Sequence, residues 1–285
     1  MIKTLLTFTF LLFACMCLKS CKRDAPLYEV NNLNGNVISA FGHGGMGVQF
    51  KFPIDSYESI EPCLRIGADG TEIDIQLTKD SILVAYHNSD LNESTSSSGM
   101  INDLLWSQIW SCHYASPFSA TVKLRSVDEI FSEIPNPHDH TFTFDSKLYN
   151  HNADQVAFRN QYANAIINFI DAHDINEERI YIESSDTVFL QILKTKRSSL
   201  KLFIYPGSFE EGFSIAKNMN LFGIVISTSI ITKEQVTLAH ENGIRITLFN
   251  TRTKDENLNA ILKSPDFVQS DDIIYLLKVF GKYKK

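Results

Sequence analysis

The sequence predicts an α/β protein that folds as a single-domain (β/α)8 TIM barrel over residues 37–285. From residue 37 onward, short runs rich in β-branched and aromatic residues alternate with stretches whose apolar residues recur at helical spacing. Eight strand positions in this alternation match the number of strands and the chain length that such a barrel needs. A doubly wound open sheet is the competing arrangement. That fold usually carries a glycine-rich phosphate loop after its first strand, and the stretch HGGMG at 43–47 resembles one only weakly.

The predicted strands lie at 37–41, 71–77 together with 82–86, 141–144, 179–182, 201–205, 222–226, 245–249 and 267–269. The first predicted helix, 56–66, carries Tyr57, Ile60 and Leu64 at spacings of three and four. The longest helix is predicted at 153–173, and the others at 187–196, 210–219, 233–242, 254–263 and 271–280. Gly243 directly follows one of them, where glycine favours a helix end before the next strand.

The beginning of the chain has the layout of a targeting signal. Lys3 precedes an apolar run at 5–13, which is too short to span a bilayer. The segment LKSC at 18–21 resembles a bacterial lipobox, so residues 1–20 are predicted to be a lipoprotein signal peptide and Cys21 to carry a lipid anchor in the membrane. Cys15 is a second candidate for the lipid, and plain secretion or an uncleaved anchor are the alternatives. Residues 21–36 are then predicted to form a polar tether, and the protein is predicted to be exported and anchored in the periplasm or at the cell surface.

The net charge of the chain narrows the class of partners that it can bind. The formal net charge is −7, which argues against nucleic acid as a partner because duplex binding draws its affinity from Lys and Arg. Small anionic substrates are not excluded, since they need only a local cation.

Cys63 and Cys112 could form a disulfide in an exported chain. Two cysteines in a domain with a large core are more often free and buried, and that is the prediction here.

Polar side chains gather where the predicted strands end, which is the face of a (β/α)8 barrel that carries the chemistry. Glu72 and Asp74 share one face of their strand because they lie two positions apart. Neighbouring carboxylates repel one another unless they hold a hard cation, and oxygen ligands suit Mg²⁺ or Ca²⁺. Imidazoles titrate near neutral pH and can transfer protons in ester cleavage. The strand-end residues are His43, Glu72, Asp74, His87, Asp145, Lys147 and Asn250.

Each of these residues also has an explanation without chemistry. A histidine at a strand end is more often a hydrogen-bonded structural residue, and Glu72 and Asp74 could belong to an exposed strand face. Lys147 beside Asp145 could be a surface salt bridge worth less than about 1 kcal/mol. The joint position of these residues at strand ends favours a site that holds a divalent cation and cleaves phosphate esters.

The stretch GADGTEIDIQLTKDSILVAYHN at 67–88 resembles the signature of the glycerophosphodiester phosphodiesterase family. Shorter segments at 43–45, 53–56, 99–103, 126–130 and 144–147 resemble further motifs of that family. The resemblance implies a small-molecule phosphodiester substrate, such as a glycerophosphodiester cleaved to glycerol 3-phosphate and an alcohol. It also implies a divalent cation, Ca²⁺ or Mg²⁺, on Glu72, Asp74 and Asp145, acid–base catalysis by His43 and His87, and substrate contacts by Lys147, Asp55 and Asn250.

The chain departs from the family pattern beside these residues. Gly44 stands in place of an arginine, a side chain that binds phosphate with two hydrogen bonds. Asp55 replaces an asparagine, which adds negative charge near the expected phosphate or supplies another metal ligand. Smaller departures are Asp145 for glutamate, Asn88 for aspartate and Thr247 for an aromatic residue.

These departures change the predicted substrate contacts and retain the acid–base and metal residues. They predict a phosphodiesterase whose substrate is shifted from that of the family. One alternative is a phosphatidylinositol phospholipase C-like phosphodiesterase or lyase. The other is a non-catalytic surface lipoprotein that binds a phosphorylated ligand or a glycan on a degenerate barrel.

Overall fold

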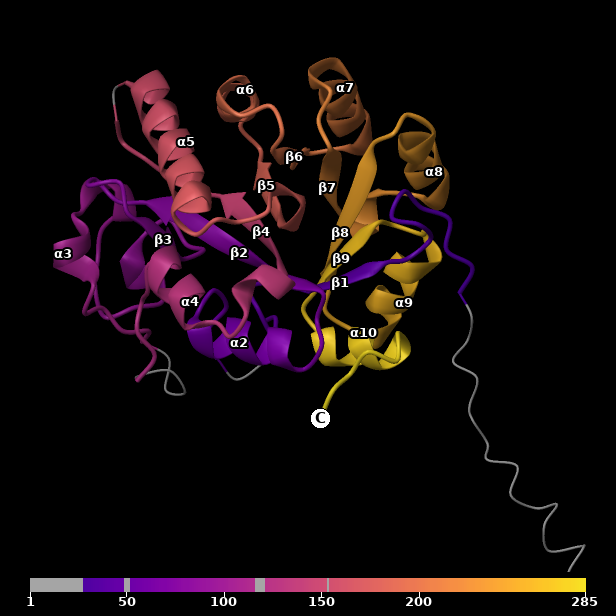
Figure 1. Ribbon diagram of the computed structural model, residues 1–285, viewed down its shortest axis with the longest axis horizontal. Coiled ribbons are helices and arrows are strands. Elements are labelled where there is room, and N and C mark those ends of the chain that lie inside the picture. The colour runs from indigo at the N-terminus through magenta and orange to yellow at the C-terminus, as the bar shows by residue number, and fades with distance from the viewer. Residues whose placement is uncertain (1–27, 49–51, 116–120, 153) are drawn as a thin grey trace, which may run out of the picture.

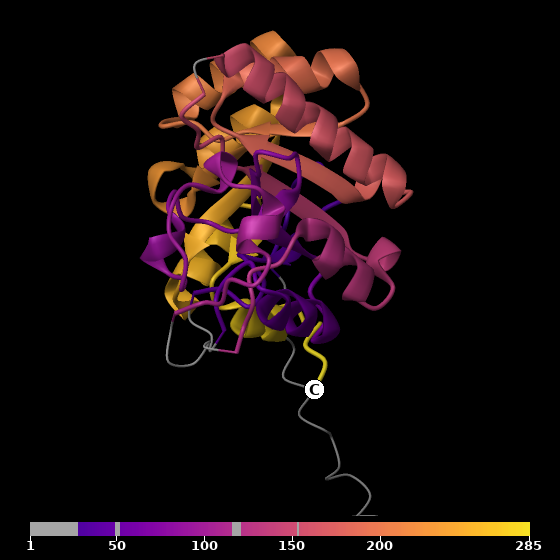
Figure 2. The same cartoon turned by 90° about the vertical axis from the view of Figure 1, so that its left-hand side faces the viewer.

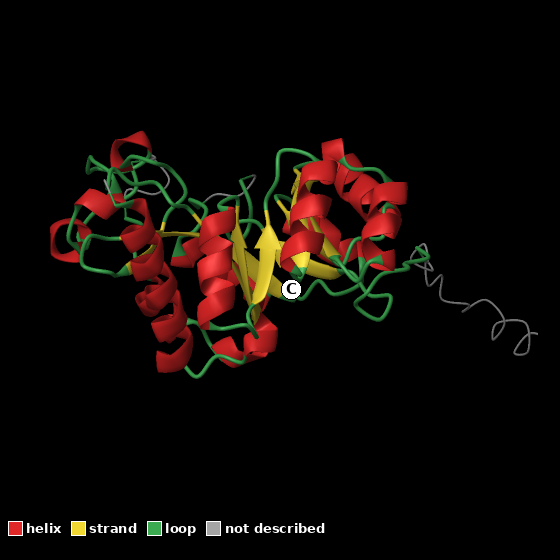
Figure 3. Ribbon diagram, turned by 90° about the horizontal axis from the view of Figure 1, so that it is seen from above, coloured by secondary structure: helices red, strands yellow, loops and turns green. Residues whose placement is uncertain are grey.

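The computed structural model describes residues 28–48, 52–115, 121–152 and 154–285. Eight parallel strands form a closed ring, because β1 pairs with both β2 and β9. The strands lie at the centre of the molecule with the helices around them (Figure 3). The predicted (β/α)8 TIM barrel is thereby confirmed. The barrel strands are β1 (Ser39–Gly42), β2 (Gly70–Leu77), β4 (Thr141–Ser146), β5 (Ile180–Ser184), β6 (Lys201–Ile204), β7 (Gly223–Ser227), β8 (Arg245–Thr251) and β9 (Phe267–Ser270).

The remaining strand, β3 (Leu83–Ala85), lies outside the barrel. It pairs antiparallel with β2, so the predicted run at 82–86 forms a hairpin with the second barrel strand. The described part of the chain after β3 packs around a small apolar core of its own, to which Tyr86, Ile101 and Leu124 belong. This part lies at the left of Figure 1 and faces the viewer in Figure 2. Its short helices are η1 (Leu91–Glu93), η2 (Ile101–Asp103) and α3 (Trp106–Ile109).

The longer helices cover the outside of the barrel (Figure 1). The sequence analysis predicted all of them except α4, a helix of seven residues. That helix begins with a capping box in which Ser126 and Glu129 satisfy each other's backbone N–H groups. No helix in the described ranges is both long and apolar enough to cross a bilayer. The helices are α2 (Tyr57–Arg65), α4 (Val127–Glu133), α5 (Gln155–Ala172), α6 (Thr187–Lys196), α7 (Phe209–Met219), α8 (Lys233–Glu241), α9 (Lys254–Leu262) and α10 (Ile273–Val279), with 3-10 turns η3 (Pro137–Asp139), η4 (Glu177–Arg179) and η5 (Thr228–Ile230).

An aromatic floor fills the inside of the barrel near the N-terminal ends of the strands. It consists of Phe41, Tyr181, Phe203, Phe222 and Phe267. The ring centroids of Tyr181 and Phe267 lie 5.2 Å apart, and those of Phe41 and Phe267 lie 5.4 Å apart. Side chains alternate along a strand, so the residue two positions beyond a floor residue also points into the barrel, nearer its C-terminal end. The floor therefore supports a second layer of inward-pointing side chains.

Residues 28–36 are the described part of the predicted tether, and they lie against the barrel. The side chain of Asn32 donates to the carbonyl of Pro265 at 2.7 Å, and the backbone of Leu33 donates to the carboxylate of Asp266 at 2.8 Å. Both acceptors directly precede β9. The predicted signal peptide and Cys21 fall outside the described residues.

The two cysteines of the barrel are not bridged. Cys63 and Cys112 are both free and buried, as predicted. Cys63 belongs to the main apolar core beneath α2, whereas Cys112 belongs to the small core of the segment after β3. Their separate cores explain why no disulfide joins them.

Candidate active site

The candidate site is the layer of side chains above the aromatic floor. Glu183 stands two positions beyond Tyr181, and Gln269 stands two positions beyond Phe267. The layer surrounds a cavity of about 130 Å³ at the C-terminal ends of the strands. Five of the eight predicted site residues line it, namely His43, Glu72, His87, Asp145 and Lys147, together with Glu183, Tyr205, Val225, Phe249 and Gln269.

Three carboxylates form a buried cluster beside this cavity. One oxygen from each of Asp55, Glu72 and Asp74 lies within 4.8 Å of the others, and each residue is at most 2% exposed. Oδ2 of Asp55, Oε1 of Glu72 and Oδ2 of Asp74 are buried without a hydrogen-bond partner. Buried polar atoms are normally paired, so three neighbouring carboxylates that each keep an unpaired oxygen need protons or a positive partner. Oxygen ligands converging in this way fit a hard divalent cation.

The pKa values of the three clustered carboxyl groups differ from their usual ranges. Burial, with the neighbouring charge of Asp74, raises the pKa of Glu72 to about 8. Burial and the charges of Asp74 and Glu72 raise the pKa of Asp55 well above its usual range. Burial alone would raise the pKa of Asp74, but Lys147, together with the nearby His87 and His43, lowers it. Without a cation, the cluster therefore favours protons on Glu72 and Asp55.

Backbone contacts hold these carboxylates in place. The amide of Gly44 donates to Oε2 of Glu72 at 2.8 Å, and the amide of Asp74 donates to Oδ1 of Asp55 at 3.0 Å. Asp55 adopts a left-handed backbone conformation with φ of 65°, which aspartate tolerates better than most residues. Its own amide donates to the carbonyl of Gly44 at 3.0 Å. The turn that carries Asp55 is thus fastened to the loop after β1.

Lys147 is fully engaged by two carboxylates. Its ammonium lies 2.8 Å from Oδ1 of Asp74 and 2.6 Å from Oδ2 of Asp145. These two charges raise the pKa of Lys147 against the opposing effect of burial. Asp145, predicted to be a metal ligand, is thus placed as a partner of Lys147, whereas Asp55 completes the carboxylate cluster. Both role predictions, for Asp145 as a ligand and for Lys147 as a phosphate contact, stay predictions.

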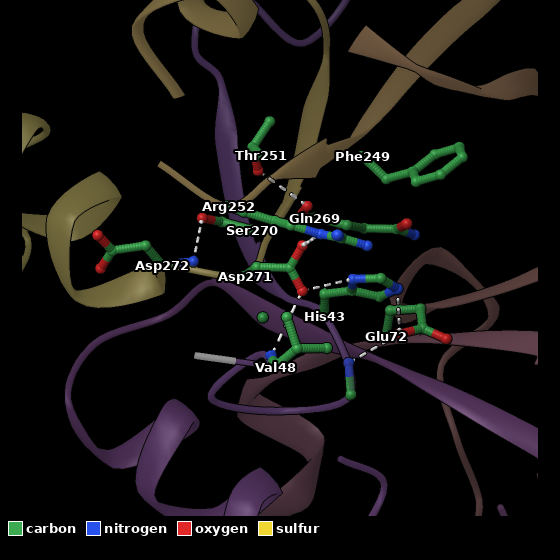
Figure 4. Close-up of polar contacts among 12 residues, drawn as sticks. His43, Val48, Glu72, Phe249, Thr251, Arg252, Gln269, Ser270, Asp271 and Asp272 are labelled. Atoms are coloured by element: carbon green, nitrogen blue, oxygen red, sulfur yellow. Dashed lines mark hydrogen bonds and ion pairs between the residues drawn. The ribbon is translucent and has the colours of Figure 1, made fainter. Parts of the chain in front are cut away.

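His43 is oriented by a residue that the sequence did not predict. Its Nδ1 lies 2.9 Å from Oδ1 of the buried Asp271, and its Nε2 lies 4.0 Å from Oε2 of Glu72 (Figure 4). Burial alone would lower the pKa of His43, but the hydrogen bond to Asp271 and the charge of Glu72 raise it to about 9. Asp271 also accepts from the amide of Val48 at 3.4 Å, and the hydrogen bond from His43 lowers its pKa despite burial. This pairing fixes the imidazole and leaves Nε2 on the side of Glu72.

His87 lines the same cavity from the hairpin side. It follows β3 by two residues, and its Nδ1 lies 2.8 Å from Oδ1 of Asn88. The amide of Asn88 in turn donates to Oγ of Ser94 at 3.3 Å. Asn88 therefore orients the imidazole of His87 with an uncharged amide, at the position where an aspartate was expected.

Asn250 lies at the edge of the site. It is exposed at the end of β8, and its amide donates to Oγ of Ser227 at 3.3 Å. It has a left-handed backbone with φ of 65°, and it is not among the residues that line the cavity. Its predicted substrate contact stays a prediction.

Sequence reasoning missed several lining residues. Glu183 is buried and accepts from the amide of Gln269 at 2.6 Å, and burial raises its pKa well above its usual range. Tyr205 and Phe249 form an edge-to-face pair with ring centroids 5.3 Å apart. The alternation of side chains along each strand could have predicted these residues, because residues two positions apart lie on the same face. Asp271 likewise stands two positions beyond Gln269.

Comparisons with known proteins agree with the barrel fold. The model of the glycerophosphoryl diester phosphodiesterase family matches residues 46–275. A glycerophosphodiester phosphodiesterase of Caldanaerobacter subterraneus is 23% identical over 234 residues, which cover 81% of this chain and 93% of that protein. The family match begins just after β1 and contains every predicted site residue except His43.

Two solved structures share the fold. One is a phosphodiesterase of Oleispira antarctica in complex with the product sn-glycerol-3-phosphate, with a TM-score of 0.74, 16% identity and coverage of 85% of this chain and 96% of that one. The other is a glycerophosphodiester phosphodiesterase of Parabacteroides distasonis, with a TM-score of 0.72, 16% identity and coverage of 86% and 97%. At this identity the two structures establish the fold.

Proposed function

Since this chain belongs to the glycerophosphoryl diester phosphodiesterase family, we propose that it cleaves glycerophosphodiesters to glycerol 3-phosphate and an alcohol with the help of a divalent cation. One observation carries the proposal. Two imidazoles, His43 and His87, line the same cavity as Glu72, a member of a buried carboxylate cluster with unpaired oxygens. The product bound to the Oleispira antarctica phosphodiesterase supports the choice of substrate.

The carboxylate cluster is the part of the chain that would hold the cation. The fit rests on two features of Asp55, Glu72 and Asp74: one oxygen of each lies within 4.8 Å of the others, and each residue keeps a buried oxygen without a hydrogen-bond partner. When bound, such a cation draws charge from a phosphoryl oxygen and offsets the charge that grows there during cleavage. Lys147 keeps Asp74 ionised, and the Gly44 amide fixes Glu72.

The two histidines would move the protons. Cleavage of a phosphodiester requires that the attacking hydroxyl lose a proton and that the leaving alkoxide gain one. His43 is fixed through Nδ1 by Asp271, and His87 is fixed through Nδ1 by Asn88. Each imidazole therefore keeps Nε2 for the substrate. The departures at Gly44 and Asp55 favour a substrate that differs from the common one in how its phosphate and alcohol are bound.

A turnover assay tests this function. The purified protein is incubated with a panel of phosphodiesters, including glycerophosphocholine and phosphatidylinositol, in Ca²⁺, Mg²⁺ or a chelator. We expect cation-dependent release of glycerol 3-phosphate that His43→Ala and His87→Ala each reduce by at least about 100-fold, the usual contribution of a general acid or base. His151→Ala is the matched control, because His151 is 71% exposed and pairs with Asp103. Tight binding of a diester without turnover of any would refute the proposal and favour a binding protein.

We also propose that the protein is exported and anchored by a lipid on Cys21. The lipobox-like segment at 18–21 and the apolar run before it support this. The test is incorporation of a labelled fatty acid and partition into detergent, which Cys21→Ser should abolish and Cys15→Ser should not. Loss of labelling in Cys15→Ser alone would move the anchor to Cys15.

A further inference from the structure

Arg252 has a rigid backbone beside the candidate active site. It directly follows β8, and its amide donates to the carboxylate of Glu256 at 2.9 Å. The preceding carbonyl, that of Thr251, accepts from the buried amide of Asn257 at 3.0 Å. These contacts belong to the capped start of α9, so the Cα of Arg252 is held in one place.

The side chain of Arg252 is held only loosely. Its Nε lies 3.7 Å from Oδ2 of Asp271, beyond hydrogen-bond distance, and the side chain is 60% exposed. The other oxygen of Asp271 binds His43 (Figure 4). A guanidinium with five N–H donors is therefore placed one carboxylate away from a catalytic imidazole, with most of its donors facing solvent.

A phosphate group in the cavity needs a cationic hydrogen-bond donor, and the lining of the cavity has none to spare. Its described lining contains Lys147 as the one Lys or Arg side chain, and two carboxylates already hold that ammonium. The loop after β1 offers no room for another cation, because a Cβ on Gly44 would lie 2.5 Å from Cβ of Ile54. Gly44 also has a φ of 56°, which disfavours any side chain. An anionic diester would meet the carboxylates Glu72 and Asp145 with no free guanidinium or ammonium in the wall.

We propose that Arg252 is a specificity-determining residue that binds two unesterified oxygens of the phosphate group in the substrate and in the product. The planar guanidinium matches two phosphate oxygens, and it has no strong partner to leave. Its fixed backbone and its contact with Asp271 keep it beside His43, so the phosphate is drawn toward that imidazole. This inference rests on the proposed function for the identity of the substrate.

The test separates phosphate binding from an effect through Asp271. Arg252→Gln, Arg252→Lys and the control Lys254→Gln are made in the full chain, and their thermal stability is compared with that of the wild type. Lys254 is an exposed cation two residues away, so the control reports the loss of one positive charge without the proposed contact. The measurements are made in the presence of Mg²⁺ or Ca²⁺. They give the KM and kcat for glycerophosphocholine, the pH profiles of both constants, and the Kd for glycerol 3-phosphate.

Arg252→Gln should raise the KM and the Kd for glycerol 3-phosphate by roughly 10-fold or more, as expected for the loss of a charge-assisted hydrogen-bond pair. The pH profile should shift only slightly, because the Arg252 charge is the weakest of the main influences on the pKa of Asp271. Arg252→Lys should recover only part of the loss, and Lys254→Gln should change either constant less than about 2-fold. An unchanged Kd in Arg252→Gln overturns the inference, and so does a shifted pH profile with unchanged product binding. The Kd needs no turnover, so a protein that binds glycerol 3-phosphate through Arg252 but cleaves no diester refutes the proposed function alone.

Discussion

Replacing Glu72 by glutamine should stabilise the protein in the absence of a cation. Glu72 is 2% exposed and shares its cluster with two other carboxylates. The glutamine carbonyl can still accept from the amide of Gly44, which binds Oε2 of Glu72 at 2.8 Å. The new NH₂ group can donate to oxygens of Asp55 or Asp74 that have no partner. The substitution therefore replaces a carboxyl group that must bind a proton on folding with a neutral amide that can donate a hydrogen bond.

The size of this effect follows from the raised pKa of Glu72. The pKa of Glu72 is about 8 in the folded chain, against 4.5 for an ordinary glutamate. The folded state then keeps a proton that the unfolded state has released, so the stability of the wild type falls as the pH rises from 4.5 to 8. At pH 7 the accumulated cost is about 3–4 kcal/mol, because pH 7 lies 2.5 pH units above the ordinary value of 4.5 and each unit corresponds to about 1.4 kcal/mol. That value is a ceiling for the gain, since it assumes that the glutamine loses none of the contacts of the carboxyl group.

Urea unfolding in a chelator measures the difference. The wild type, Glu72→Gln and Glu241→Gln are compared between pH 5 and pH 8, where Glu241→Gln removes an exposed carboxylate and serves as the charge-matched control. We expect Glu72→Gln to gain 1–3 kcal/mol at pH 7, roughly, and to lose most of the pH dependence. Added Ca²⁺ or Mg²⁺ should then stabilise the wild type more than the variant, because the ligand is gone. The reasoning fails if Glu72→Gln is less stable than the wild type in chelator, or if both keep the same pH slope.

Three further outcomes follow from the contacts. Lys147→Met should lower the free energy of unfolding in chelator by about 3–5 kcal/mol, because it leaves the carboxylates of Asp74 and Asp145 without their shared positive partner. Urea unfolding measures this loss, and no loss would show that the two ion pairs contribute nothing to stability. Cys63 should resist a thiol-alkylating reagent in the folded protein, since burial raises the pKa of its thiol to about 12, and mass spectrometry of native and urea-unfolded samples tests it. Ser126→Ala should destabilise the protein by about 1 kcal/mol through loss of the cap on α4, whereas a change below about 0.3 kcal/mol would deny the cap a role.

The sequence alone was sufficient for the fold and for half of the site. Alternating strand and helix patterns predicted the barrel, because hydrophobic periodicity is a local property of each segment. The spacing of two between Glu72 and Asp74 placed both carboxylates on the inner face of β2 by strand geometry. His43 and His87 were placed at the cavity by the rule that strand ends carry the chemistry.

Tertiary structure alone decided which of these groups are partners. His43 and Asp271 lie 228 positions apart in sequence, and they meet because β1 pairs with β9 to close the ring. Asp55 enters the carboxylate cluster, and Asp145 pairs with Lys147, through a left-handed turn and a side-chain geometry that no periodicity encodes. Sequence patterns fix the face on which a side chain lies, whereas contacts between faces depend on how the whole ring closes.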